Sequence, residues 1–186
     1  KETILFDTDE HPRKTTLDKL ASLKPVFKQN GTVTAGNSSG RNDGASALLV
    51  MSEKAANEYG LKPKARIIAH AAAGVSPEIM GIGPVLSTMK ALKLANLTLN
   101  DIGLIELNEA FAAQSLAVIK EWNINIDKVN VNGGAIALGH PIGASGAILL
   151  TKLLHELERR GERYGLVTLC IAGGMGITTI VENLQV

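Results

Sequence analysis

From residue 65 to the end of the chain, segments typical of strands alternate with segments typical of helices. The clearest helix is predicted over 143–161, where Leu150, Leu153 and Leu157 share one face and Gly161 marks the end. Helices are also expected within 83–98 and 111–122, and strands within 65–74, 101–110, 128–134 and the two runs of 164–183. This order predicts an α/β domain in which helices cover a mixed sheet of five strands.

The first third of the chain has a different pattern. Residues 1–14 are charged and without period, which indicates a loop or an extended arm, and 15–23 favours a short helix. Gly, Asn, Ser and Asp dominate 30–44, a loop long enough to suggest a functional role. A buried strand or short helix is expected over 45–51, followed by a helix that ends at Gly60.

Composition excludes several classes of function. The formal net charge is +1 and aromatic residues make up 3%, so neither a basic footprint nor a stacking platform for nucleic acid is expected. No apolar run reaches the roughly 18 residues of a membrane helix. The single cysteine, Cys170, excludes an intrachain disulfide and favours a reducing compartment, with the cytoplasm as the default. The chain lacks an initiator Met, so we expect it to be part of a longer one.

Three chemically capable side chains fall near strand ends. Asn108 closes one predicted strand, His140 follows the next in a glycine-rich loop, and Cys170 lies near the end of a third. Open α/β sheets bind ligands at such an edge, and a Cys and a His brought together there could exchange protons.

Taken singly, each residue also has a simpler explanation: an inert buried thiol, a hydrogen-bonded loop imidazole and a helix N-cap. The glycine loops match neither the dinucleotide nor the P-loop motif, and the four histidines are not paired at helical spacing, so no metal site is expected.

Five blocks, in order, give the chain a family resemblance. "NEAFAAQ" (108–114), "GGAIALGHPIGASGA" (133–147) and "CIAGGMG" (170–176) resemble the thiolases, and so do "GTVTAGNSSGRNDGA" (31–45) and "MGIGP" (80–84). The resemblance covers essentially the whole chain. It implies a thiolase-like layered fold and an acyltransferase of the acetyl-CoA acetyltransferase type, which joins two acetyl-CoA into acetoacetyl-CoA and CoA or catalyses the reverse thiolysis.

The resemblance also implies a role for each residue of the site. His140 would activate a nucleophilic cysteine and help to hold the thioester oxyanion, Asn108 would position a water in that oxyanion hole, and Cys170 would be the acid/base for the α-proton. The backbone N–H of Ala172, where the family usually has glycine, would serve a second oxyanion hole. The residues implied in binding CoA or substrate are Ser39, Ala35, Met80, Ala110 and Phe111.

The nucleophilic cysteine of the family belongs to an N-terminal half that this chain lacks, so the chain alone is expected to be inactive. The resemblance divides the chain into the tail of the loop domain (1–44), the end of the N-terminal core domain (45–62) and the C-terminal core domain (63–186). Expected partners are acetyl-CoA, acetoacetyl-CoA and CoA, the missing half and further copies in a dimer or tetramer, with no prosthetic group, metal, nucleic acid or membrane.

Two alternatives stay open. One is a degradative 3-ketoacyl-CoA thiolase that acts on longer chains within fatty acid metabolism. The other is a non-catalytic thiolase-like module that binds CoA or a protein, although such a module has no need of His140, Asn108 and Cys170 together.

Overall fold

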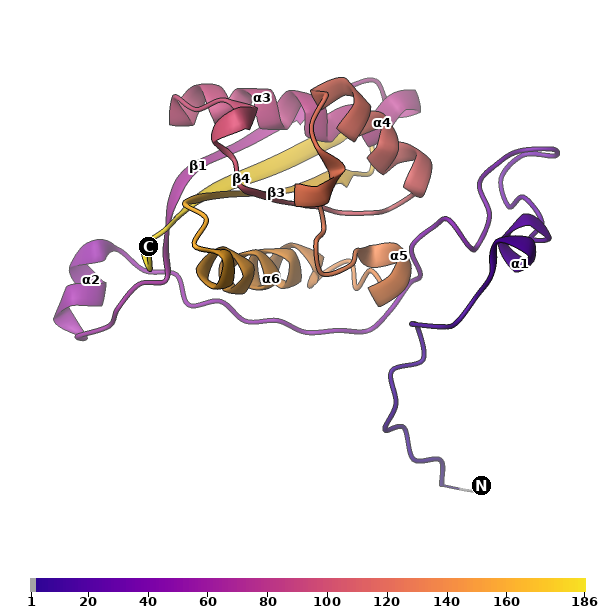
Figure 1. Cartoon of the computed structure of the whole chain (residues 1–186), viewed down its shortest axis with the longest axis horizontal. Coiled ribbons are helices and arrows are strands. Elements are labelled where there is room, and N and C mark those ends of the chain that lie inside the picture. The colour runs from indigo at the N-terminus through magenta and orange to yellow at the C-terminus, as the bar shows by residue number, and fades with distance from the viewer. Residues whose placement is uncertain (1–2) are drawn as a thin grey trace.

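The computed structural model describes residues 3–186, which form a four-stranded sheet with helices on both faces and a long N-terminal arm (Figure 1). The strands are β1 (Ala65–Gly74), β2 (Leu104–Leu107), β3 (Tyr164–Ile171) and β4 (Met175–Asn183), in the spatial order β1-β4-β3-β2. β2 and β3 run parallel, and the other two pairs are antiparallel. The predicted mixed sheet is confirmed.

Two layers of helices enclose the sheet (Figure 1). α3 (Gly83–Ala95) and α4 (Ala112–Trp122) cover one face, and α5 (Ala135–Leu138) and α6 (Ser145–Arg160) lie on the other. α1 (Leu17–Ala21) and α2 (Glu53–Glu58) belong to the first third of the chain, and the short 3-10 helices are η1 (Pro77–Ile82), η2 (Leu99–Asp101) and η3 (Ile126–Lys128). None of the helices in the described residues is both long and apolar enough to cross a membrane.

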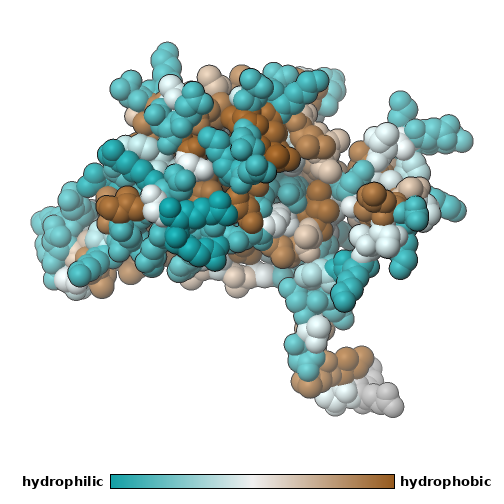
Figure 2. Space-filling model, viewed as in Figure 1, coloured by the Kyte–Doolittle hydropathy of each residue, from teal (hydrophilic) through white to brown (hydrophobic). Residues whose placement is uncertain are grey.

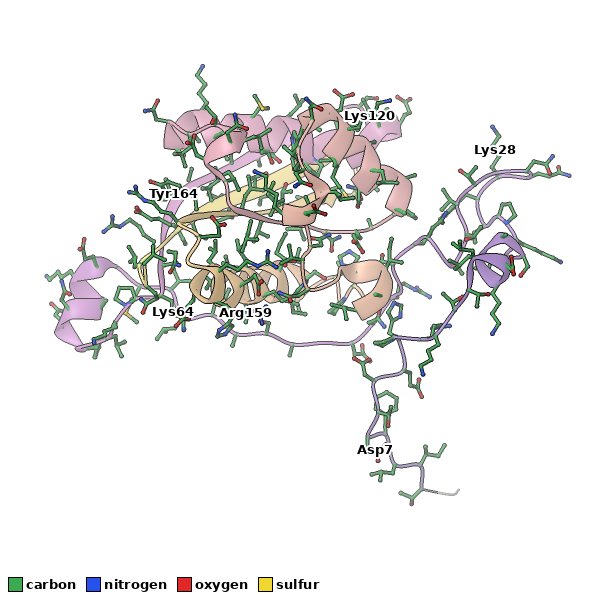
Figure 3. The ribbon with its side chains drawn as sticks, viewed as in Figure 1. Asp7, Lys28, Lys64, Lys120, Arg159 and Tyr164 are labelled. Carbon is green, nitrogen blue, oxygen red and sulfur yellow. The ribbon has the colours of Figure 1, made fainter. Side chains whose placement is uncertain are left out.

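Alternating side chains of the strands build a separate core on each face of the sheet. Ile105, Leu166 and Ile180 pack with α3 and α4 into the larger core. Their sequence neighbours Leu104, Val167 and Val181 pack against α6. A strand buried on both faces carries apolar residues on both, which is why Leu104–Ile105, Leu166–Val167 and Ile180–Val181 are adjacent apolar pairs. Figure 3 shows the side chains that fill the space between the layers.

The prediction of a fifth strand within 128–134 is wrong. This segment makes one isolated bridge, Ile105 to Val129, and then turns at Asn130, which has a φ of +48°. The Asn130 carboxamide pairs with both backbone groups of Leu107: Leu107 N–H donates to Oδ1 and Nδ2 donates to the carbonyl, each at 2.8 Å. A side chain therefore takes the place of the next strand residue.

The strand or short helix expected over 45–51 is also absent from the described structure, where this segment runs extended beside α6 (Figure 1). A strand requires a neighbour that pairs its N–H and C=O groups, and no strand pairs with this one within residues 3–186. Leu49 and Val50 are accordingly exposed, and Figure 2 shows further apolar surface, in brown, over the body and the arm.

The helices predicted within 15–23, 52–60, 83–98, 111–122 and 143–161 are confirmed, as are the strands at 65–74 and 164–183. Their ends follow the expected chemistry. Thr16 and Ser52 cap α1 and α2 through their hydroxyl groups, and Gly161 ends α6 with a φ of +67°. The residues of the expected arm at 3–14 have no helix or strand, while residues 1 and 2 lie outside the described structure.

α3 approaches β4 so closely that two glycines touch through their backbones. A Cβ added to Gly83 would collide with the Met175 carbonyl, and one added to Gly176 would collide with the Gly83 backbone. Beside this contact, Thr178 Oγ1 lies 2.7 Å from Ser87 Oγ and 2.8 Å from Thr168 Oγ1. The hydroxyl groups satisfy one another inside the protein, which fixes the start of α3 on the sheet.

We expect Gly176→Ala to lower the free energy of unfolding by about 2–3 kcal/mol, because backbone cannot move aside as a flexible side chain can. Urea denaturation measures the change. Gly146→Ala is the matched control: a Cβ there meets nothing within 4 Å, and Gly146 lies inside α6, where alanine is favoured by up to about 1 kcal/mol. Equal effects of the two substitutions would contradict the close contact.

Candidate functional site

Two of the predicted site residues lie at one edge of the sheet. Because β2 and β3 are parallel, their carboxyl ends meet there: Asn108 directly follows β2, and Cys170 is the next-to-last residue of β3. The Asn108 N–H donates to the Thr168 carbonyl at 3.0 Å, which extends the ladder by one bond and fixes the Asn108 backbone near Cys170. Asn108 is buried and Cys170 is half-buried.

The third predicted residue, His140, contacts Asn108. Asn108 Nδ2 lies 3.4 Å from His140 Nε2. On the other side of the ring, Nδ1 lies 2.6 Å from Ser145 Oγ, and this hydroxyl donates its hydrogen to the Pro141 carbonyl at 2.9 Å. With its hydrogen so placed, Ser145 accepts from Nδ1–H. The network therefore assigns the neutral ring with Nδ1 protonated, and Nε2 presents a basic lone pair beside Asn108.

Burial shifts the ionisation of both titratable residues toward their neutral forms. It lowers the pKa of His140 below its ordinary value, because the charged imidazolium loses hydration. It raises the pKa of the Cys170 thiol for the corresponding reason, since the thiolate is the charged form. At neutral pH the site thus holds an imidazole base and a protonated thiol.

The glycine loop before His140 leaves helical geometry at Gly139, which has a φ of +99°. A Cβ there would also press on the Asn42 side chain. Asn42 Oδ1 accepts from the His140 N–H at 3.0 Å, and a one-residue bridge joins Arg41 to His140. The turn-rich loop 30–44 therefore contacts the site, as its length suggested.

Carboxylates fix the segment 130–136, which leads into the loop. Glu109 accepts from the Ile136 N–H at 3.1 Å and from Asn130 Nδ2 at 3.1 Å. Glu156, buried in α6, accepts from Asn132 Nδ2 at 2.9 Å and pairs with two arginines of its own helix.

The third carboxylate acts through a lysine. Lys152 Nζ donates to buried Glu106 at 2.9 Å and to the Gly133 carbonyl at 2.6 Å, so it joins β2 to the loop. Desolvation raises the pKa of Glu106, and the hydrogen bond and charge of Lys152 oppose that rise. The cation thus partly offsets the cost of burying a carboxylate at this position.

The residues expected to bind substrate come from three segments. The Ser39 N–H donates to the Ala110 carbonyl at 3.0 Å, and neighbouring Ser38 forms an antiparallel bridge with Phe111, so the loop 30–44 and the start of α4 lie side by side. Met80 is half-buried in η1, whose next residue packs on Gln114 of α4. Ala35 lies exposed in the turn before Gly36.

Ala172 lies exposed in the turn between β3 and β4. In the described part of the chain, positive φ values in this turn occur at Gly173 and Gly174 and not at Ala172. The alanine therefore carries no left-handed strain.

Sequence reasoning missed three residues that this geometry makes important: Ser145, Asn42 and Lys152. Ser145 offered the one usable signal, a hydroxyl five residues after His140 at the start of the longest predicted helix. No set of three or more His, Cys, Asp or Glu side chains in residues 3–186 is arranged to hold a metal ion.

Comparisons with known proteins agree with this fold. Residues 61–183 match the family model described as thiolase, C-terminal domain, and residues 1–54 match thiolase, N-terminal domain. The chain is 57% identical over 186 residues to acetyl-CoA acetyltransferases of Syntrophomonas wolfei and of Escherichia coli, covering at least 99% of this chain and 47% of each relative. It thus spans about half the length of the curated relatives that it matches.

Two solved structures resemble this fold closely. The Bacillus anthracis acetyl-CoA acetyltransferase superimposes with a TM-score of 0.93 at 51% identity, over 99% of this chain and 48% of that one. Human mitochondrial 3-ketoacyl-CoA thiolase in complex with CoA gives a TM-score of 0.89 at 49% identity, over 96% and 45%. Sequence blocks, family models and superposition therefore agree that the chain belongs to the thiolase family.

Proposed function

We propose that this chain supplies the acid/base half of a thiolase active site that interconverts two acetyl-CoA with acetoacetyl-CoA and CoA. The observation that carries the proposal is the Asn108–His140 contact at the sheet edge shared with Cys170. Relatives named acetyl-CoA acetyltransferase at 57% identity favour acetyl groups over the longer chains of the alternative thiolase.

His140 acts first as a base. Its Nε2 lone pair takes the proton of a cysteine thiol provided by the N-terminal half, and the resulting thiolate attacks the carbonyl carbon of acetyl-CoA. Negative charge develops on the carbonyl oxygen and is stabilised by the protonated imidazole and by a water that Asn108 Nδ2 positions. The sulfur–carbon bond to CoA then breaks, leaving an acetyl-enzyme.

Cys170 then acts as an acid and afterwards as a base. Its thiol, kept protonated by burial, gives its proton to the leaving CoA sulfur. The Cys170 thiolate so formed removes the α-proton of a second acetyl-CoA. The carbanion attacks the acetyl-enzyme, the new carbon–carbon bond forms, and the enzyme sulfur leaves with the proton that His140 returns. The N–H of Ala172 is proposed to stabilise the second acyl oxygen.

Open space at two glycines supports an approach of the substrate here. A Cβ at Gly143 or Gly146, on either side of the start of α6, would meet nothing within 4 Å, so the slender pantetheine arm of CoA can pass close to the backbone. We assign Ser39 and Ala35 to this channel and Met80, Ala110 and Phe111 to the acyl pocket. No prosthetic group takes part in this scheme.

We expect thiolysis of acetoacetyl-CoA, followed as loss of its absorbance with CoA present, only when this chain is joined to the N-terminal half. In that protein, Cys170→Ala should lower kcat by about 10²–10⁴-fold, because a positioned acid/base is lost. Lys93→Ala, exposed near the end of α3 and outside both the site and the groove, is the control that should retain activity. Full activity of Cys170→Ala would refute the assignment.

Activity should also depend on His140 ionisation. Since only the neutral ring accepts the thiol proton and burial lowers its pKa, the acid limb of kcat/KM is expected to have its midpoint below about 6.5. A pH profile measured with acetoacetyl-CoA tests this. A midpoint above 6.5 would contradict a desolvated, uncharged base.

We also propose how the two halves join. An apolar groove of about 640 Å³ lies between the extended segment 47–53, residues 61–67 and α6. Leu150 and Leu154 of α6 line it together with Leu49 and Ile67, which are 79% and 50% exposed. The missing half is the proposed occupant. The domain division at residues 44 and 62, a cytoplasmic location and a homo-oligomer are further parts of the proposal. The break between the two family matches, at 54–61, supports only the boundary near residue 62.

If the groove is an interface, the chain expressed alone should associate into particles heavier than its 19.6 kDa. Leu49→Glu should reduce that association, while Leu86→Glu, an equally apolar exposed site on α3 outside the groove, should not. Light scattering during size-exclusion chromatography measures the mass. A parent chain that is a folded, monodisperse monomer would contradict the proposal.

A further inference from the structure

The carbonyl of Ile136 and the N–H of His140 are four residues apart, the spacing of a helical hydrogen bond. In the structure this bond is not made, because α5 ends after Leu138 and the chain turns at Gly139. The His140 N–H goes instead to Asn42 Oδ1 at 3.0 Å. The Ile136 carbonyl is thereby released and needs another donor.

His11 is that donor. Its Nε2 lies 3.0 Å from the Ile136 oxygen, across 125 residues of sequence. A carbonyl can only accept, so Nε2 carries the hydrogen. The ring also lies against Gly40, where a Cβ would come within 2.5 Å of Cε1 and 2.9 Å of Nδ1. His11 therefore touches both segments that hold His140, the loop at 40–42 and the turn at 136–140.

The rest of the arm behaves differently. Every side chain from residue 3 to residue 19 is exposed except that of His11. Figure 3 shows the arm near Asp7 pointing away from the body. The placement of His11 is thus a specific anchor and not a part of general packing of the arm.

We propose that His11 is a positioning residue for His140: it takes over the Ile136 carbonyl so that His140 can leave the helix and turn its ring toward Asn108 and Ser145. This inference rests on the proposed function only for the role of His140. The pair of caps, His11 on the carbonyl and Asn42 on the N–H, replaces the one helical bond that would otherwise keep the His140 backbone in α5.

The test compares His11→Ala, His11→Gln and Glu10→Ala in the full-length protein. Glutamine places an amide donor near the position of Nε2, so it should retain the bond, and Glu10→Ala removes an exposed neighbour as a control. Hydrogen exchange, followed by mass spectrometry, gives the exchange rates of peptides that cover 134–144 and α6. Thiolysis kinetics read kcat and KM.

For His11→Ala we expect exchange in 134–144 to be about tenfold faster with α6 unchanged, because a part-buried carbonyl loses its donor. kcat should fall by about tenfold with KM nearly constant, and His11→Gln should restore both. Unchanged exchange in His11→Ala, or no rescue by His11→Gln when α6 exchanges normally, overturns the inference. The exchange measurement needs no turnover, so an inactive parent protein would refute the proposed function and leave this test intact.

Discussion

The pairing of one carboxamide with one backbone residue determines how this chain reaches its site. Asn130 satisfies both the N–H and the C=O of Leu107, so the edge of β2 is closed by a side chain. The backbone is then free to turn with positive φ and to enter α5 instead of continuing as a strand. All later contacts of the site, from Glu109 to His140, start from the position that this turn sets.

Small residues dominate the loop after the turn, so hydrogen bonds to charged side chains, and not apolar packing, hold the loop in place. Glu109 binds the loop directly, and Glu106 and Glu156 act through Lys152 and Asn132. Glu106 lies on β2, Glu109 follows two residues after its end, and Glu156 lies on α6. Rigid elements thus fix a segment of small residues whose backbone must stay uncovered for a ligand.

Much of the fold could be predicted from local pattern. The leucine spacing of α6, the caps of α1 and α2 and the aliphatic runs of β3 and β4 are local signals, and local propensity decided each of them. The fifth strand failed because "KVNVNGG" alternates like a strand while the tertiary bonds of Asn130 override that alternation. Asn108 and Cys170 lie at one edge as predicted because the carboxyl ends of parallel β2 and β3 meet there, whereas His140 reaches Asn108 from the turn after α5 and not from a strand end. His11 and Asn42 lie about 100 residues or more from their partners in the sequence, and the residues around them give no local signal for those hydrogen bonds.

The partner of His140 has a consequence for what the ring does with a proton. In serine hydrolase triads a carboxylate stabilises the imidazolium, but here Nδ1–H meets the neutral hydroxyl of Ser145, whose own hydrogen is committed to Pro141. A neutral acceptor fixes the orientation and tautomer of the ring and adds less to its proton affinity than a carboxylate would. In the proposed mechanism His140 therefore holds a proton at Nε2 only briefly: no carboxylate on the Nδ1 side stabilises the imidazolium, so the ring readily passes the proton on.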